Sequence, residues 1–325
     1  MLAYSIRRLL TAIPTLFLGV SLTFFIIRLA PGDPTDRFLT PTMSPKVKAA
    51  VTEKFGLNES LPVQYMTWLK NVIINFDFGD SFANGRKAST VIMDALPSTL
   101  LLSSLSLLFG VLLGILLGVY SAIRVGTPID GTITSILVFF YSVPSFWLGL
   151  ILLGISSIEL NWLPGSQITS IFHERLSFFG KIGDYAAHLI LPVLTLGLTT
   201  APVFGRFVRS SMVEVLNSDF IVSARARGLS ERKIVFNYGL RNALLPLISI
   251  LGTSFPVLFS GAVIVEVIYS LPGMGRVMVD AALGRDYPII MAASAVAFFA
   301  VIIGNILSDI GYAVADPRVR LGDSS

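Results

Sequence analysis

A basic segment at residues 206–241 holds the side chains of this chain that are best placed to do chemistry. It lies between two long apolar stretches, and its centre reads Asp219-Phe-Ile-Val-Ser-Ala-Arg-Ala-Arg-Gly-Leu-Ser-Glu231. Asp219 is placed to cap a helix over 220–227, because its carboxylate faces the positive end of the helix dipole. Gly228 suits the left-handed residue that ends such a helix. We therefore predict a short helix with defined ends.

A second helix is predicted after the glycine. Ser230 is placed as its cap, Glu231 falls in its first turn, and the helix runs toward Arg241. Two short helices joined at Gly228 are expected to lie along the membrane surface. Such a unit is too ordered for a plain connector, so we expect another protein to bind it.

The first of these helices presents small side chains on one face. Ile221, Ala224 and Gly228 share this face, and Arg225 and Arg227 flank it. The arrangement favours a helix that enters a groove of a cytoplasmic protein. The alternative is a basic loop against anionic lipid headgroups, for which a looser cluster of Lys and Arg would suffice.

The rest of the sequence offers little chemistry of its own. It contains no Gly-x-x-x-x-Gly-Lys-Ser/Thr run for a nucleotide phosphate, no Gly-x-Ser-x-Gly and no His-Glu-x-x-His. It has no cysteine, and His173 and His188 are too few and too separated for a histidine metal centre. The net charge of +4 is small and does not indicate nucleic-acid binding. We expect no catalytic residue, no metal and no cofactor bound by this chain.

The composition indicates what positions the basic segment. The chain has 325 residues, 54% hydrophobic and 14% charged, whereas a soluble domain has about 25% charged residues. Six uncharged stretches each reach the roughly 18 residues of a membrane-spanning helix, and they cover residues 9–27, 95–123, 131–158, 185–205, 242–265 and 287–308. Lipid offers no partner for free backbone groups, so we predict an all-α membrane protein with six transmembrane helices.

The first stretch is expected to be a retained helix, because it is too long for the core of a signal peptide. Lys and Arg in short connections concentrate on the cytoplasmic side. Arg7 and Arg8 precede the first span, Arg124 lies between the second and third, and seven basic residues crowd 206–241. Both termini and the basic segment are therefore predicted to be cytoplasmic.

Residues 31–94 are predicted to form a small extracytoplasmic segment. Helical spacing occurs over 46–55 and 63–76. The apolar residues of the second of these helices are predicted to share one face: Val63, Met66, Leu69, Val72 and Ile73. The segment is either a packing lid or a docking platform for an extracellular partner.

Within the spans, Gly110, Gly114 and Gly118 recur every four residues, a pattern that lets two helix backbones approach closely. Pro144 is expected to bend the third span. Glu266 and Asp309 lie near span ends. Each is either an interfacial or structurally paired residue, or part of a proton relay. Polar residues in the spans either line a passage or form hydrogen bonds between helices, and both explanations fit equally well. The candidates for a passage are Thr199, Thr253, Ser254 and Asn305.

At these residues the chain resembles the permeases of ABC importers, in their dipeptide and oligopeptide branch. The basic segment is similar to their EAA loop, in Ser223-Ala-Arg-Ala-Arg-Gly-Leu-Ser-Glu231 and Leu240-Arg-Asn-Ala-Leu-Leu-Pro246. The resemblance extends along nearly the whole chain, including Leu29-Ala-Pro-Gly-Asp-Pro34, Ser142-Val-Pro-Ser-Phe-Trp-Leu-Gly149 and Leu271-Pro-Gly-Met-Gly275. Two places depart from it. Val222-Ser-Ala stands where the general motif has Glu-Ala-Ala, and Phe76-Asp-Phe-Gly replaces Gly-Asp-Leu-Gly.

The resemblance implies the type I ABC-importer permease fold, in a bacterial or archaeal cytoplasmic membrane. It implies a homologous second permease subunit, two ATPase subunits that hold ATP and Mg, an extracytoplasmic solute-binding protein and surrounding lipid. The expected divisions are a first helix at 1–30, the outer segment at 31–94, a core at 95–315 and a tail at 316–325.

The family's coupling role is carried over to matching residues, with Ala224 and Gly228 as close-packing positions. The set comprises Asp219, Ser223, Ala224, Arg225, Arg227, Gly228 and Glu231. Peptides are the cargo that the resemblance favours. The same branch carries nickel, metal chelates, glutathione and oligosaccharides. An ATP-independent secondary transporter and a purely structural scaffold are the alternatives from other classes.

Overall fold

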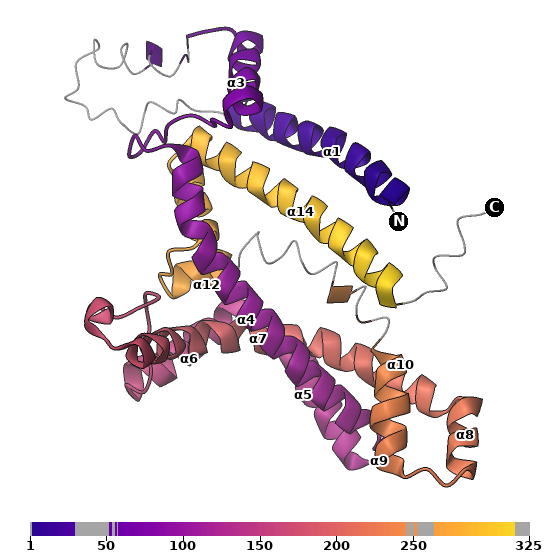
Figure 1. The fold of residues 1–325 in the computed structure, drawn as a ribbon. Coiled ribbons are helices and arrows are strands. Elements are labelled where there is room, and N and C mark those ends of the chain that lie inside the picture. The colour runs from indigo at the N-terminus through magenta and orange to yellow at the C-terminus, as the bar shows by residue number, and fades with distance from the viewer. Residues whose placement is uncertain are drawn as a thin grey trace. The chain divides into compact units, whose positions relative to one another are not determined.

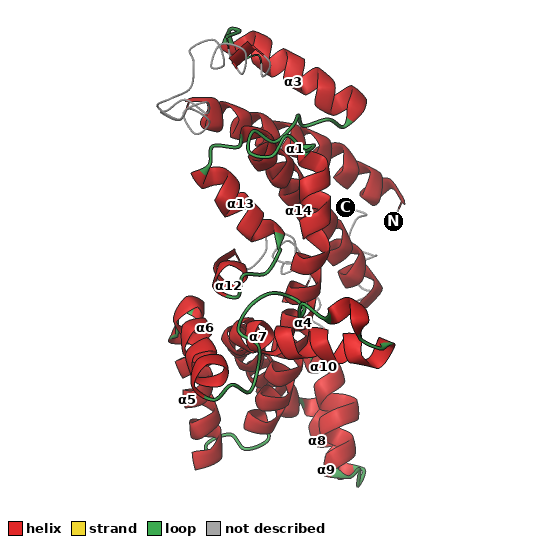
Figure 2. Ribbon diagram, turned by 90° about the vertical axis from the view of Figure 1, so that its left-hand side faces the viewer, coloured by secondary structure: helices red, strands yellow, loops and turns green. Residues whose placement is uncertain are grey.

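The computed structural model describes residues 2–29, 52, 53, 56, 58–244, 247, 250, 251 and 263–315, with side chains between residues 13 and 306. These residues form helices joined by turns (Figures 1 and 2), and their only β contact is an isolated bridge between Asp80 and Lys87. The chain divides into two compact units. Unit 1 comprises Met1–Pro97 with Pro272–Ile303, and unit 2 comprises Ser98–Leu271 with Gly304–Ser325.

Unit 1 includes residues 31–94, the segment predicted to be extracytoplasmic. Its helices are α1 (Leu2–Leu29), α3 (Leu61–Asn75), the start of α4 (Ala88–Ala122), α13 (Met274–Leu283) and the first part of α14 (Tyr287–Ala315). The helix predicted over 63–76 is confirmed as α3, which Phe76 ends in a left-handed conformation. The helix predicted over 46–55 lies largely outside the described residues.

The face of α3 that carries the apolar spacing is not the face through which the helix packs. Met66 and Ile73 are more than 60% exposed, and the helix packs instead through Tyr65 and Trp68. The ring of Phe24 on α1 lies 5.3 Å from both of these rings. Because two large aromatic side chains bury more area than the aliphatic ones, they decide which face turns inward.

A buried carboxylate holds the loop at residues 81–83 to the start of α14. Asp286 is 2% exposed and accepts hydrogen bonds from the backbone N–H groups of Phe82 and Ala83, at 3.0 and 3.2 Å. The Ser81 hydroxyl donates to the same carboxylate. These bonds satisfy a charge that would otherwise be costly to bury.

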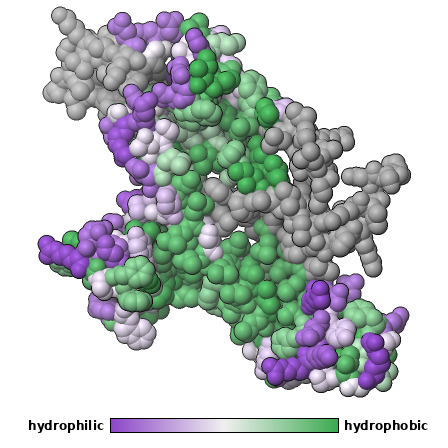
Figure 3. All heavy atoms as spheres, viewed as in Figure 1, coloured by the Kyte–Doolittle hydropathy of each residue, from purple (hydrophilic) through white to green (hydrophobic). Residues whose placement is uncertain are grey.

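Unit 2 carries the basic segment. After α4 come α5 (Pro128–Ser142), α6 (Ser145–Leu153), the π-helical η2 (Gly154–Glu159), the 3₁₀ turn η3 (His173–Arg175) and α7 (Phe178–Leu216). Then follow α8 (Asp219–Ala226), α9 (Glu231–Lys233), the π-helical η4 (Ile234–Leu240), α10 (Arg241–Ala243) and α12 (Val263–Ile268). Figure 3 shows hydrophilic residues gathered at the end of this unit that carries α8 and α9.

Three of the described helices are long and apolar enough to cross a membrane: α4, α7 and α14. They match the spans predicted at 95–123, 185–205 and 287–308. The part of α1 whose side chains are described, Ile13–Leu29, is a shorter apolar helix. The span predicted at 242–265 lies largely outside the described residues.

The third predicted span, 131–158, is not one straight helix. Its two parts, Pro128–Ser142 and Ser145–Glu159, meet at an angle of 96°. Val143 and Pro144 between them are extended. A proline disfavours helical backbone in the residue before it and has no N–H to donate, so the helix stops at Ser142.

Candidate functional site

The first helix of the basic segment, α8, begins one residue earlier than predicted. Ser218 is the extended capping residue, and Asp219 is the first helical residue. The Ser218 hydroxyl donates to the Val215 carbonyl at the end of α7 and makes no capping bond to α8. Asp219 therefore acts through its charge in the first turn, where the helix dipole favours a carboxylate.

Gly228 ends α8, and the predicted left-handed glycine is confirmed by its φ of 77°. Its N–H donates to the Arg225 carbonyl at 2.9 Å, and the N–H of Leu229 donates to the Ala224 carbonyl at 3.4 Å. This pair of bonds is a Schellman motif, which satisfies the last carbonyls of the helix. The turn out of α8 is therefore fixed by the backbone.

The return path is a continuous helical run, α9–η4–α10, and it begins at Glu231 as predicted. Its middle is a π-helical stretch, which the sequence did not indicate. Gly239 in this stretch lies against α7: a Cβ there would meet Leu216 at 3.2 Å and Met212 at 3.3 Å. A glycine at this position lets the run approach α7 closely.

The two arms enclose a small core. Ile221 and Ala224 of α8 and Ile234 of η4 are each 0% exposed, with Leu216, Leu229 and Tyr238 packed around them. The face that the sequence indicated for an external groove is thus used inside the chain. Ile221 reaches it because a large aliphatic side chain gains more from burial than from exposure to water. We call residues 219–240 the coupling hairpin, after the role that the resemblance predicts for them (Figure 1).

The outward side of the coupling hairpin is mixed in character. Phe220 and Val222 are 44% and 57% exposed, and Ser223 and Arg227 are also exposed. Arg225 donates from Nε and Nη2 to the two carboxylate oxygens of Glu231, at 2.8 and 3.4 Å. These bonds raise the pKa of the Arg225 guanidinium. Two residues predicted to contact a partner therefore contact each other across the turn.

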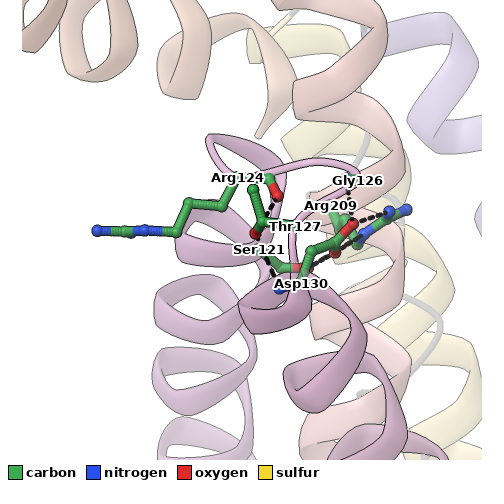
Figure 4. Close-up of polar contacts among 6 residues, drawn as sticks. All are labelled: Ser121, Arg124, Gly126, Thr127, Asp130 and Arg209. Carbon is green, nitrogen blue, oxygen red and sulfur yellow. Dashed lines mark hydrogen bonds and ion pairs between the residues drawn. The ribbon is translucent and has the colours of Figure 1, made fainter.

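A second arginine–carboxylate pair joins α7 to α5, and its arginine lies ten residues before the first residue of α8 (Figure 4). Arg209 donates to both carboxylate oxygens of Asp130 on α5, each at 2.8 Å. Ser121 on α4 donates to the same carboxylate, and the Gly126 N–H does so at 3.1 Å. The Asp130 side chain is 8% exposed. The consecutive helices α4 and α5 and the sequence-distant helix α7 are thus joined at one carboxylate.

The sequence analysis missed Asp130. Thr127 precedes it as a capping residue, accepts its N–H at 3.4 Å and is followed by Pro128. This Thr-Pro-x-Asp pattern is a helix-start signal, and it places the aspartate in the first turn of the helix. Its partner could not be read from the sequence, since Arg209 lies 79 residues away.

The glycine row of α4 lies directly against α7. A Cβ at Gly114 would come within 2.7 Å of the Ala201 carbonyl, and one at Gly118 within 2.6 Å of the Gly205 carbonyl. A Cβ at Gly110 would lie 3.1 Å from the Gly197 carbonyl. The facing row on α7, Gly197-Ala201-Gly205, has the same spacing of four and was not noticed in the sequence.

The structure describes two of the four residues suggested to line a passage, Thr199 and Asn305. The Thr199 hydroxyl donates to carbonyls of its own helix, those of Thr195 and Leu196, at 3.2 and 3.0 Å. Asn305 is exposed on α14. Thr253 and Ser254 lie outside the described residues.

The two histidines and Glu266 make contacts that their sequence positions did not indicate. His173 and His188 both face Asp184: Nδ1 of His173 lies 2.7 Å from its carboxylate, and Nδ1 of His188 lies 2.8 Å from its carbonyl. Glu266 is 0% exposed and accepts a hydrogen bond from Thr99 at 2.8 Å. This contact agrees with a structurally paired Glu266; the Asp309 side chain lies outside the described part.

Comparison with known families matches almost the whole chain. A family described as "Binding-protein-dependent transport system inner membrane component" matches residues 110–321. A second, described as the N-terminal membrane component of such systems, matches residues 1–103.

Similar proteins have names that refer to peptide transport. The oligopeptide transport system permease protein AppB of Bacillus subtilis is 42% identical over 322 residues, which is 98% of this chain and 100% of AppB. The di/tripeptide permease protein DppB of Pseudomonas aeruginosa is 35% identical, and the glutathione permease protein GsiC of Salmonella typhimurium is 36% identical; in both, the match covers 98% of this chain and 99% of the relative.

Solved structures share the fold. One of them is a chain of the inward-facing MetNI methionine ABC transporter, with a TM-score of 0.52 and 18% identity. The match covers 69% of this chain and 94% of that one. At this identity the likeness concerns the fold alone.

Proposed function

This chain belongs to the family of binding-protein-dependent transport system inner membrane components, and on this premise we propose that it is a permease subunit of an ATP-driven ABC importer. In this proposal it pairs with a homologous second permease and forms half of the passage. Two ATPase subunits bind ATP and Mg beneath it, and a solute-binding protein delivers cargo from outside. The chain itself contributes no catalytic group.

The observation that supports the proposal most is the construction of the coupling hairpin. Its turn is fixed by the bonds at Gly228, its arms share a core, and Gly239 lies close to α7. A segment built this way moves as one body with α7. Coupling requires such rigidity, because each state of an ATPase can favour one arrangement of the spans only through a firm connection.

The coupling residues take different parts in this proposal. Asp219, Ser223 and Arg227 are exposed and would contact the ATPase. Ala224 supports the hairpin from inside, and the pair Arg225–Glu231 holds the two arms. Gly228 both ends α8 and lies exposed at the turn. Its Cβ position is open, with nothing within 4 Å, so a side chain there would project toward the partner.

The cargo is proposed to be peptides, because two of the relatives named above are oligopeptide and di/tripeptide permeases. Glutathione is the second candidate, supported by GsiC. Nickel, metal chelates and oligosaccharides remain the alternatives within the same machinery.

We also propose the arrangement predicted from the sequence: both termini in the cytoplasm, an extracytoplasmic segment at 31–94, a core at 95–315 with its coupling loop at 206–241, and a tail at 316–325. The basic residues of 206–241 support this orientation. Thr199, Thr253, Ser254 and Asn305 stay candidates for the passage. A cysteine at the exposed Arg227 should react with a membrane-impermeant thiol reagent only in inverted vesicles.

The central experiment is ATP-driven peptide uptake into proteoliposomes that contain the assembled complex. Gly228→Asp should abolish uptake and ATPase binding, while the amount of inserted subunit stays at the parent level. Gly85→Asp is the matched control, because Gly85 is also left-handed, with a φ of 68°, and has nothing within 4 Å of its Cβ position. Normal uptake by Gly228→Asp would refute the proposed coupling site. Uptake by the parent chain without any ATPase would favour a secondary transporter.

A further inference from the structure

Unit 1 contains a cavity that the transport role leaves unexplained. It lies among α1, α3, the loop at residues 77–82 and the start of α14, and its volume is about 410 Å³. Small-molecule sites generally have volumes of roughly 300–1,000 Å³. The lining contains both polar and aromatic residues, and the aromatic ones are Phe24, Trp68, Phe78, Phe82 and Tyr287.

Two hydrogen-bond donors in the lining have no acceptor among the described residues. The guanidinium of Arg28 lies over the rings of Phe24 and Tyr287, at 5.5 and 5.2 Å, and none of the described carboxylates pairs with it. Ring contacts occupy the face of a guanidinium and leave its N–H edge free. Nε1 of Trp68 is buried and also lacks a partner among the described residues. A buried indole N–H and a half-buried guanidinium without acceptors in the described part of the chain favour a ligand that brings an acceptor.

The opposite charge is present in the same lining. Glu53, Glu59 and Asp80 line the cavity, and none of them forms an ion pair within the part of the chain that the structure describes. Asp77 differs, because Lys87 lies 3.3 Å from its carboxylate. A simple anion would be repelled by three unpaired carboxylates, and a simple cation would be repelled by Arg28. A molecule that carries both charges suits the whole lining.

We propose that this cavity binds a small zwitterionic solute of the amino acid or short peptide class. Its carboxylate accepts from Arg28 and Trp68, its ammonium group faces the acidic residues, and its apolar part lies against the aromatic rings. The site belongs to unit 1 and does not depend on the coupling role of the hairpin. It would give the outer segment a solute-sensing function of its own.

The cavity supplies its own reporter. The chain has three tryptophans, so Trp147→Phe with Trp162→Phe leaves Trp68 as the sole indole. In this background, the full chain in lipid nanodiscs without nucleotide should show a saturable change in fluorescence when alanyl-alanine is added. N-acetyl-alanyl-alanine and alanyl-alanine amide each lack one charge. Each should bind at least about tenfold more weakly than alanyl-alanine.

Single variants locate the two charges. Arg28→Gln should weaken alanyl-alanine binding about tenfold or more, and Glu59→Gln should weaken the free dipeptide but not the N-acetylated one. Arg86→Gln is the control, since Arg86 forms an exposed pair with Asp94 in the same unit and is absent from the lining. Should Arg28→Gln fail to fold, the blocked peptides and Glu59→Gln still decide the question.

The proposal is overturned if no saturable change occurs, if Arg28→Gln binds like Arg86→Gln, or if the blocked dipeptides bind as well as the free one. Because no ATPase or nucleotide is present, failure of the coupling proposal would leave these results unchanged, and the reverse also holds.

Discussion

Two arginine–carboxylate pairs in unit 2 have the same chemistry and different surroundings. Arg209 and Asp130 join α7 to α5, with 32% and 8% of their side chains exposed. Arg225 and Glu231 bridge the turn of the coupling hairpin and are 45% and 66% exposed. Both pairs have a 2.8 Å bond from Nε to a carboxylate oxygen.

The difference lies in what surrounds each carboxylate. Ser121 and Gly126 also donate to Asp130, so removing one partner leaves several groups unsatisfied away from water. Water can replace either partner of the pair at the turn. The Arg209–Asp130 pair therefore holds helices together. The Arg225–Glu231 pair is a surface contact that contributes little to the stability of the hairpin, which comes from its core.

The largest effect is expected from Asp130→Asn. It leaves Arg209 without its counter-charge while preserving the shape of the side chain, and the melting temperature of the full chain in detergent should fall by about 5–10 °C. Asp94→Asn removes a carboxylate from the exposed pair with Arg86 and is the control. Equal melting temperatures for these two variants would show that burial does not separate the two kinds of pair.

Ile234→Ala should come next, because it removes most of a fully buried side chain from the core of the hairpin. Ile→Ala substitutions in cores cost about 2–5 kcal/mol. Hydrogen exchange of the amides of residues 219–240 should accelerate at least about tenfold. Phe236→Ala, at a 53% exposed position in the same π-helical stretch, should leave exchange nearly unchanged. Exchange that instead depends on Glu231 would contradict the view that the core carries the hairpin.

The turn of this hairpin could be predicted from the sequence, whereas its internal packing could not. Gly228 follows a short run with a helix-start signal, and the physics of a left-handed end is local. Which face of α8 turns inward depends on Ile234 and Leu216, which belong to other helices. The sequence suggested an external groove because small residues indicate close contact without saying with what.

The same limit applies elsewhere in the chain. The glycine row of α4 predicts close packing, but only the structure identifies Gly197, Ala201 and Gly205 of α7 as the facing row. Pro144 predicts a bend, and its size depends on how both helix halves pack. The contact between Asp130 and Arg209 could not be predicted, because nothing in either local pattern specifies a partner 79 residues away.

Arg209→Lys should have an intermediate effect and tests geometry separately from charge. Lysine keeps the positive charge but cannot make two parallel bonds to one carboxylate. The melting temperature should fall by about 2–4 °C, less than for Asp130→Asn. A loss as large as that of Asp130→Asn would show that the forked geometry, rather than neutralisation of Asp130, holds the three helices together.

Glu231→Gln should have the smallest effect on stability. The exposed pair contributes below about 1 kcal/mol, so the melting temperature should move by no more than about 2 °C. Salt screens exposed charges more than buried ones, and 0.5 M NaCl should remove this small difference while the loss caused by Asp130→Asn persists. In the assembled complex, the same variant frees Arg225 at the turn and should change the salt dependence of ATPase binding. If Glu231→Gln destabilised the isolated chain as strongly as Asp130→Asn, the turn would be held by its ion pair, and the core of the hairpin would lose the role assigned to it.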